Sequence, residues 1–77
     1  MKYYTELTDT FGGEANYSWV KRYEFEAPDD ASDKLLVTRA KRLLGYTGYP
    51  CRKLTMGDCI ELRPANECTV IFIDVCN

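Results

Sequence analysis

Hydrophobic and polar residues alternate through the first third of the chain, as they do in a strand that buries one face. A first strand is expected over Lys2–Thr8, where aromatic and β-branched residues dominate. The alternation is most regular over Tyr17–Glu26, which predicts a second strand. Residues 9–16 between them are expected to form a loop whose turn lies at Gly12-Gly13. Together the two segments are typical of a hairpin with a long loop.

The second strand gathers its bulky side chains on one face, which comprises Tyr17, Trp19, Lys21, Tyr23 and Phe25. We expect this face to be core, because only the side of the strand that carries Trp19 offers enough bulk to pack against a helix. The alternative is that the rings are exposed. They would then suit stacking on nucleic-acid bases or act as anchors in a protein interface. The exposure of Tyr17, Trp19 and Tyr23 decides between these interpretations.

Helical periodicity replaces the alternation after Pro28, which lacks the N–H group that a strand ladder uses. Residues 29–33 combine N-cap residue types with acids that suit a helix N-terminus. The helix is expected to run to about Leu44, and Gly45 follows as a natural C-terminal cap. The apolar stripe predicted to face the sheet comprises Leu36, Val37, Ala40, Leu43 and Leu44.

Three further strand candidates follow the helix: a short one over Cys51–Thr55, one over Cys59–Arg63 that turns Ile60 and Leu62 inward, and one over Cys68–Val75. The last is apolar on both faces, which is typical of a central strand. The sequence therefore predicts a single α+β domain over residues 1–77. We expect an antiparallel β-sheet of four to five strands, in the order β-β-α-β-β-β, with one helix packed on one face. The other face is left to solvent or to a partner.

Charge is distributed unevenly along the chain, although the net charge is only −2. Residues 1–33 carry three bases and eight acids, whereas residues 34–53 carry six bases and no acid. This predicts a basic helix face in an acidic body: either an ordinary solvated face or a docking patch for phosphates or an acidic partner. The pI near 5.0 argues against general nucleic-acid affinity. The candidate partner-binding residues are Lys34, Arg39, Lys41, Arg42, Arg52 and Lys53, together with the loop aromatics Phe11, Tyr46 and Tyr49.

Catalytic and metal chemistry are poorly represented in the composition. The chain has no histidine, so Ser-His and Cys-His nucleophiles are excluded. Its four cysteines form no C-x-x-C pair, which disfavours zinc. We expect reduced thiols, with disulfides in any of three pairings as the alternative. No cofactor, no metal and no enzymatic activity are expected. The absence of a long apolar run and of a secretory signal predicts a cytoplasmic protein without a membrane span.

Two stretches carry a family resemblance: residues 9–22 (DTFGGEANYSWVKR) and residues 57–64 (GDCIELRP). They resemble segments of short proteins encoded in bacteriophages and prophages, and the resemblance spans most of the chain. It implies no particular activity. In size and acidity the chain is similar to anti-defence inhibitors such as anti-CRISPR proteins, which occupy a surface of a host complex.

These observations lead to two expectations of function. The first is a non-enzymatic phage-type binding protein, in the cytoplasm of the bacterial host, that acts by surface contact with a host protein or ribonucleoprotein, as an anti-CRISPR-like inhibitor does. The alternative is a small nucleic-acid-binding module that uses the basic helix face and exposed aromatics. Either a monomer or a homodimer is compatible with the sequence.

Overall fold

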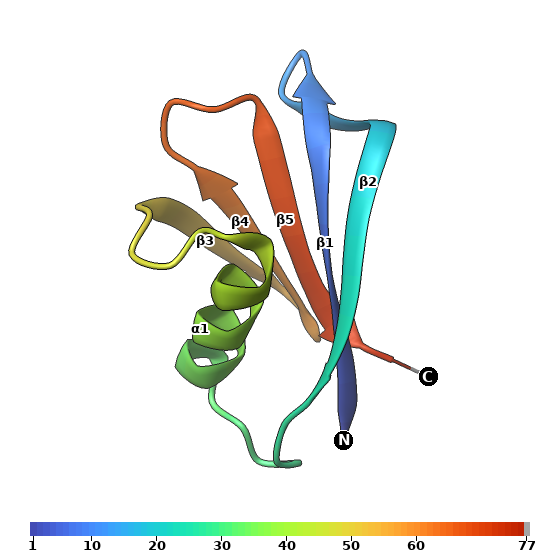
Figure 1. The fold of residues 1–77 in the computed structure, drawn as a ribbon, viewed down its shortest axis with the longest axis vertical. Coiled ribbons are helices and arrows are strands. Elements are labelled where there is room, and N and C mark those ends of the chain that lie inside the picture. The colour runs from blue at the N-terminus through green and yellow to red at the C-terminus, as the bar shows by residue number, and fades with distance from the viewer. Residues whose placement is uncertain (77) are drawn as a thin grey trace.

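The computed structural model describes residues 1–76, and over this range the chain forms one five-stranded antiparallel sheet and one helix (Figure 1). The elements are β1 (Lys2–Phe11), β2 (Glu14–Glu26), α1 (Asp33–Leu44), β3 (Cys51–Met56), β4 (Cys59–Pro64) and β5 (Thr69–Val75). The strands lie in the spatial order β2-β1-β5-β4-β3. The predicted α+β class and the β-β-α-β-β-β order are confirmed, with five strands.

The core lies between α1 and one face of the sheet, here called the covered face. Leu36 and Ala40 of α1 are buried, and the sheet residues that complete the cluster are Tyr3, Leu7, Ile60, Leu62, Ile71 and Ile73. β5 pairs with β1 on one side and with β4 on the other, as its double-sided apolarity predicted. The opposite face of the sheet, here called the open face, carries no helix (Figure 1).

The helix begins and ends where its capping residues predict. The Ser32 side-chain oxygen accepts a hydrogen bond from the Leu35 N–H at 3.2 Å, and Gly45 adopts the left-handed conformation at φ 83°. The inward orientation of Leu43 is the part of the prediction that is wrong. Leu43 is exposed, because α1 turns Leu36 and Ala40 toward the sheet and leaves Leu43 on the flank that faces β2.

The predicted loop over residues 9–16 is also wrong, because most of it is strand. β1 and β2 extend to a two-residue turn at Gly12 and Gly13, whose φ angles of 63° and 85° suit glycine. The register shifts between Thr8 and Thr10, and Tyr17 has a φ of 55°, so the hairpin contains an irregularity instead of a long loop.

The expectation that the aromatic face of the second strand is core is wrong for three of its rings. Phe25 is half-buried and stacks on Tyr3 with ring centroids 5.8 Å apart, whereas Tyr17, Trp19 and Tyr23 are 54%, 43% and 43% exposed. Strand spacing explains this. Five strands about 4.8 Å apart span about 19 Å, whereas a helix with its side chains is about 10 Å wide. One helix over the middle of the sheet therefore leaves edge strand β2 uncovered.

Among residues 1–76, no helix has the length and apolarity needed to cross a membrane.

Candidate functional site

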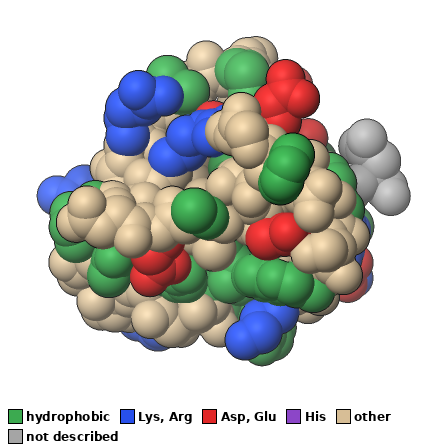
Figure 2. Space-filling view, turned by 90° about the horizontal axis from the view of Figure 1, so that it is seen from above, with side chains coloured by type: hydrophobic (Ala, Val, Ile, Leu, Met, Phe, Trp, Pro, Cys, Tyr) green, Lys and Arg blue, Asp and Glu red, His purple; other side chains and the backbone are tan. Residues whose placement is uncertain are grey.

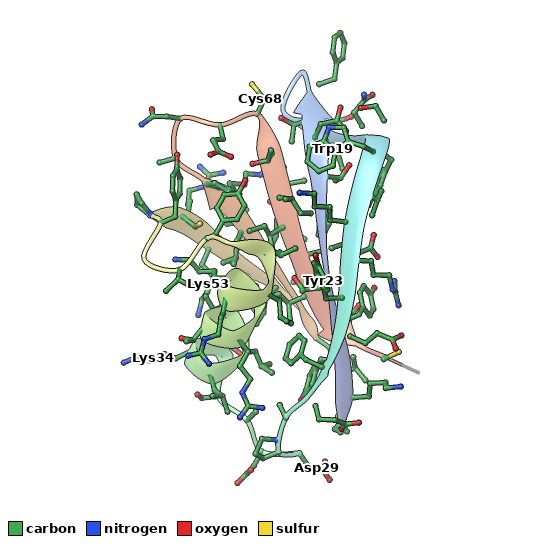
Figure 3. The ribbon with its side chains drawn as sticks, in the orientation of Figure 1. Trp19, Tyr23, Asp29, Lys34, Lys53 and Cys68 are labelled. Atoms are coloured by element: carbon green, nitrogen blue, oxygen red, sulfur yellow. The ribbon has the colours of Figure 1, made fainter. Side chains whose placement is uncertain are left out.

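A shallow groove of about 330 Å³ runs between β2 and the flank of α1. Phe25 and Glu26 line it from β2, and Arg39, Arg42 and Leu43 line it from α1. Further along β2, Tyr23 and Lys21 lie on the same face of the strand, because they are opposite the covered-face residues Thr5 and Leu7 of β1. Trp19 follows them toward the hairpin turn (Figure 3). We call the combination the aromatic–basic surface; its members are Trp19, Lys21, Tyr23, Arg39, Arg42 and Leu43.

The three basic residues of this surface, Lys21, Arg39 and Arg42, differ in whether another residue binds them. An Arg39 guanidinium N–H donates to the Glu26 carbonyl oxygen at 2.5 Å, which fixes the arginine across the groove. The ion pairs formed within residues 1–76 include neither Lys21 nor Arg42, and both residues are exposed. The Glu26 carboxylate forms its ion pair with the amino group of Met1, at 3.7 Å, and not with Arg39 or Arg42. Two cations are therefore left to attract a negatively charged group.

Asp9 organises the irregular part of the hairpin that precedes Trp19. Its carboxylate accepts hydrogen bonds from the Ser18 hydroxyl at 2.6 Å, the Ser18 N–H at 3.0 Å and the Asn16 amide at 3.0 Å. The neighbouring Thr8 hydroxyl donates to the Trp19 carbonyl oxygen at 2.9 Å. These bonds fix the backbone on both sides of the left-handed Tyr17 and so determine where the Trp19 ring leaves the strand.

The same contacts hold the pKa of Asp9 well below its usual range, with the Ser18 hydroxyl as the largest cause. A carboxylate with a depressed folded-state pKa contributes stability that is complete above its ordinary value of 3.8 and is lost as the pH falls toward the folded-state value. We expect Trp19 fluorescence, which has a single source in this chain, to report this loss between about pH 4 and about pH 2. An Asp9→Ala variant should lack this component. Identical titration curves for the two proteins would contradict the assignment.

The basic residues predicted from the sequence do not form one patch. Arg39 and Arg42 flank β2, whereas Lys41 lies on the other side of α1 and donates to the Tyr49 carbonyl oxygen at 2.5 Å. Lys34 projects away from the body of the molecule (Figure 3). Lys53 forms an ion pair with Asp33 at 3.6 Å. Arg52 is opposite Arg63 in the pairing of β3 with β4, and these two arginines lie on the open face. Of the predicted set, only Arg39 and Arg42 line the groove against β2, next to Phe25.

The loop aromatics predicted as contact residues, Tyr46, Tyr49 and Phe11, do not lie together on one surface. The hydroxyl of Tyr46 donates to Glu67 at 2.6 Å and that of Tyr49 donates to the Ala65 carbonyl oxygen at 2.7 Å. The two rings meet edge to face with centroids 5.5 Å apart, so they brace the loop after α1 against the β4–β5 turn. Phe11 is 80% exposed beside the hairpin turn. At that end of the sheet, hydrophobic side chains are interspersed with charged ones and do not merge into one patch (Figure 2).

The open face is largely occupied by internal polar contacts. Arg22 lies over the Tyr4 ring at 3.9 Å and pairs with Glu6 at 3.0 Å. The nearly buried carboxylate of Glu61 accepts from Arg63 at 2.7 Å. Because these charges satisfy one another, the open face offers fewer unpaired cations than the aromatic–basic surface does.

The four cysteines are free thiols that lie in separate places. Burial raises the pKa of Cys51 and that of Cys59, so neither thiol is activated as a nucleophile. Cys68 is exposed in the turn before β5. Among residues 1–76, no three His, Cys, Asp or Glu side chains gather in a way that would hold a metal ion.

No family model, curated protein or solved structure matches the chain. Function therefore has to be argued from the geometry. The sequence pattern identifies the ring-bearing strand but assigns Trp19, Lys21 and Tyr23 to the core, and it places the contact residues on the helix, on residues 52–53 and on the loop aromatics instead. The signal it lacked is strand order, because only the edge position of β2 exposes those side chains.

Proposed function

We propose that this chain is a non-enzymatic binding protein that acts by surface contact, with the aromatic–basic surface as the contact site. The observation that carries the proposal is the exposure of Trp19 and Tyr23 on β2, the strand whose Phe25 and Glu26 form a groove with Arg39 and Arg42. Tryptophan, tyrosine and arginine are the residue types that dominate binding free energy in protein interfaces. A domain of 77 residues buries little apolar area, and each ring outside the core reduces that area further. The exposure of these rings therefore costs stability, which supports a role for them in binding.

The charge of the surface indicates the chemistry of the partner. Lys21 and Arg42 are exposed and take no part in the ion pairs within residues 1–76, and Leu43 supplies an apolar wall between the helix and the strand. We therefore assign the surface to a protein segment that combines acidic side chains with at least one apolar anchor. The resemblance to phage and prophage proteins directs the search to bacterial host proteins and ribonucleoproteins, including those of antiviral defence, whose action this chain would block by occupying a surface.

Charge reversal on the groove should abolish partner capture. We expect an Arg39→Glu/Arg42→Glu variant and a Trp19→Ala variant to weaken binding by roughly 30-fold or more each, because truncation of a central anchor costs about 2 kcal/mol or more. Affinity capture from host lysate identifies the partner, and titration of the purified partner measures the affinity. Circular dichroism and an unfolding midpoint show whether each variant is folded.

A Lys34→Glu/Arg52→Glu variant is the matched control, because it changes the net charge by the same amount at two positions outside the surface. It should bind as the wild type does. Equal losses in both double variants would assign the effect to overall charge, and unchanged binding in the groove variants would refute the proposed surface.

The alternative function is binding of single-stranded nucleic acid by the same surface. The exposed rings of Trp19 and Tyr23 with Lys21 between them favour it, since stacking on aromatics combined with cations along the backbone is the usual mode of such proteins. A single-stranded oligonucleotide that binds and is released steeply with rising salt would select this alternative. Absence of binding at low salt would remove it.

A further inference from the structure

The outer edge of β2 presents backbone groups in a defined pattern. Met1 and Ala27 exchange both hydrogen bonds, with the Ala27 N–H donating at 3.1 Å and the Met1 amino group donating at 3.0 Å. In an antiparallel pair such opposing residues alternate between bonded and non-bonded. The pairs of Phe25, Tyr23 and Lys21 with β1 are therefore the bonded ones.

The remaining residues of β2 direct their N–H and C=O groups away from β1. They are Val20, Arg22, Glu24 and Glu26. The other side of β1 agrees with this pattern, because the Cys76 N–H donates to the Lys2 carbonyl oxygen at 2.8 Å and Lys2 is opposite Glu26. β2 is the edge of the sheet, and Val20, Arg22 and Glu24 make it an unpaired template for another strand, whereas the Glu26 carbonyl oxygen already accepts from Arg39.

The side chains along this edge are complementary to themselves. Two copies related by a two-fold axis perpendicular to the sheet pair antiparallel, and residues on the same face then lie opposite each other. An axis at Tyr23 sets Arg22 of each copy opposite Glu24 of the other, on both sides of the axis. An axis at Arg22 would oppose two arginines, and an axis at Glu24 would oppose two glutamates. An axis at Glu24 also sets Arg22 opposite Glu26, so the register centred on Tyr23 is the one that brings opposite charges together without opposing like charges.

The backbone supports the same register. Arg22 and Glu24 both direct their hydrogen-bonding groups outward, so each cross-copy Arg22–Glu24 pair exchanges two hydrogen bonds. Val20 opposite Glu26 adds a bond from the Glu26 N–H, because the Glu26 carbonyl oxygen already accepts from Arg39. The left-handed Tyr17 ends the regular part of the strand, and residues 20–26 lie wholly within that part. A register centred nearer the N-terminus would need residues beyond this irregularity.

From these observations we infer that a second copy of this chain binds along β2, to form a two-fold dimer with a continuous ten-stranded sheet centred on Tyr23. Both helices then lie on the same face of the sheet. The rings of the two Tyr23 residues meet as a non-hydrogen-bonded pair, which is the closer kind of cross-strand contact, and so lose exposed area. The inference can fail without the proposed function failing, because a monomer presents the whole aromatic–basic surface, whereas the dimer covers part of Tyr23 within it.

The opposite edge is less suited to such pairing. β3 has six residues, whereas β2 has 13, and Arg52 and Lys53 are adjacent in it. Self-pairing centred on either residue would oppose two like charges, and lysine is a residue that proteins use to protect sheet edges. A dimer that closes through β2 alone also leaves no reason for growth into longer assemblies.

A charge-exchange experiment tests the register. Sedimentation equilibrium of the full chain should show a monomer–dimer equilibrium for the wild type. Arg22→Glu opposes carboxylates and Glu24→Arg opposes guanidinium groups, so each variant alone should raise the dimer dissociation constant roughly tenfold to hundredfold. An equimolar mixture of the two variants should restore dimerisation, because each Arg22–Glu24 contact then again joins opposite charges.

Two controls keep the result specific. Arg52→Glu makes the same charge change as Arg22→Glu on the opposite edge and should leave the dimer unchanged. Glu24→Pro removes one outward N–H, which an unpaired edge tolerates, and should yield a folded monomer. Circular dichroism reports the folding of every variant. Any of three results would overturn the inference. The wild type stays monomeric at about 100 μM, the dimer persists in both charge variants, or the equimolar mixture fails to dimerise.

Discussion

Replacement of Ile71 by alanine should lower the free energy of unfolding by about 3 to 4 kcal/mol, since a buried isoleucine loses both its transfer free energy and the packing around the cavity that remains. Ile71 is fully buried in the central strand and lies between Leu7 of β1 and Leu62 of β4. A domain of this size has a total stability of roughly 4 to 12 kcal/mol, so the variant should lose between about a quarter and nearly all of it.

Denaturant titration followed by circular dichroism measures this loss. Ile71→Val, which removes one methylene, should cost only about 1 kcal/mol. Leu54→Ala is the exposed comparison, because Leu54 lies on edge strand β3 with much of its side chain in solvent, and it should change stability by less than about 0.5 kcal/mol. A similar effect of Ile71→Ala and Leu54→Ala would contradict the assignment of β5 to the core.

Replacement of Arg63 by methionine should produce the second-largest loss, about 2 to 3 kcal/mol. The Arg63 guanidinium donates to the Glu61 carboxylate at 2.7 Å and to the Gly13 carbonyl oxygen at 2.6 Å. Without the guanidinium, the Glu61 carboxylate, which is only 9% exposed, loses its ion-pair partner. Loss of one partner of a fully buried pair costs about 3 to 5 kcal/mol, and the partial exposure of Arg63 places this pair below that range.

A double variant separates the charge from the packing. Glu61→Gln/Arg63→Met removes both charges and should recover about half or more of the stability lost in Arg63→Met, because no unpaired carboxylate remains. Urea unfolding of the wild type, both single variants and the double variant completes the cycle. Additive losses would show that Glu61 and Arg63 stabilise the fold independently.

The elements of this fold could be predicted from local pattern, whereas their neighbours in the sheet could not. Alternation over Tyr17–Glu26, the cap residues Ser32 and Gly45 and the double-sided apolarity of the last strand each act within a few residues, and each prediction is confirmed. The extent of the hairpin was missed because Asp9, Asn16 and Ser18 are turn-forming residue types that here bond to one another across a bulge.

The candidate site was predicted only in part, for the same reason. Arg39 and Arg42 are predicted as bases on a helix surface, and the structure places them in a groove with Phe25, on the strand that carries the exposed rings. Trp19 and Tyr23 were assigned to the core because bulk usually indicates burial. Their exposure follows from the position of β2 at the edge of a sheet that is wider than its one helix, which no periodicity within β2 records.

The pairing of β1 with β5 joins the first strand of the chain to the last one (Figure 1). During synthesis the β1–β2 hairpin leaves the ribosome early, but β5, its neighbour in the sheet, begins only about 40 residues after the end of the hairpin at Glu26. Folding is therefore expected to be slow for a domain of this length, because the contact that closes the sheet joins strands far apart in the sequence. Until β5 arrives, Tyr3 and Leu7 stay accessible to chaperones, and any truncation within the last strand removes the centre of the sheet.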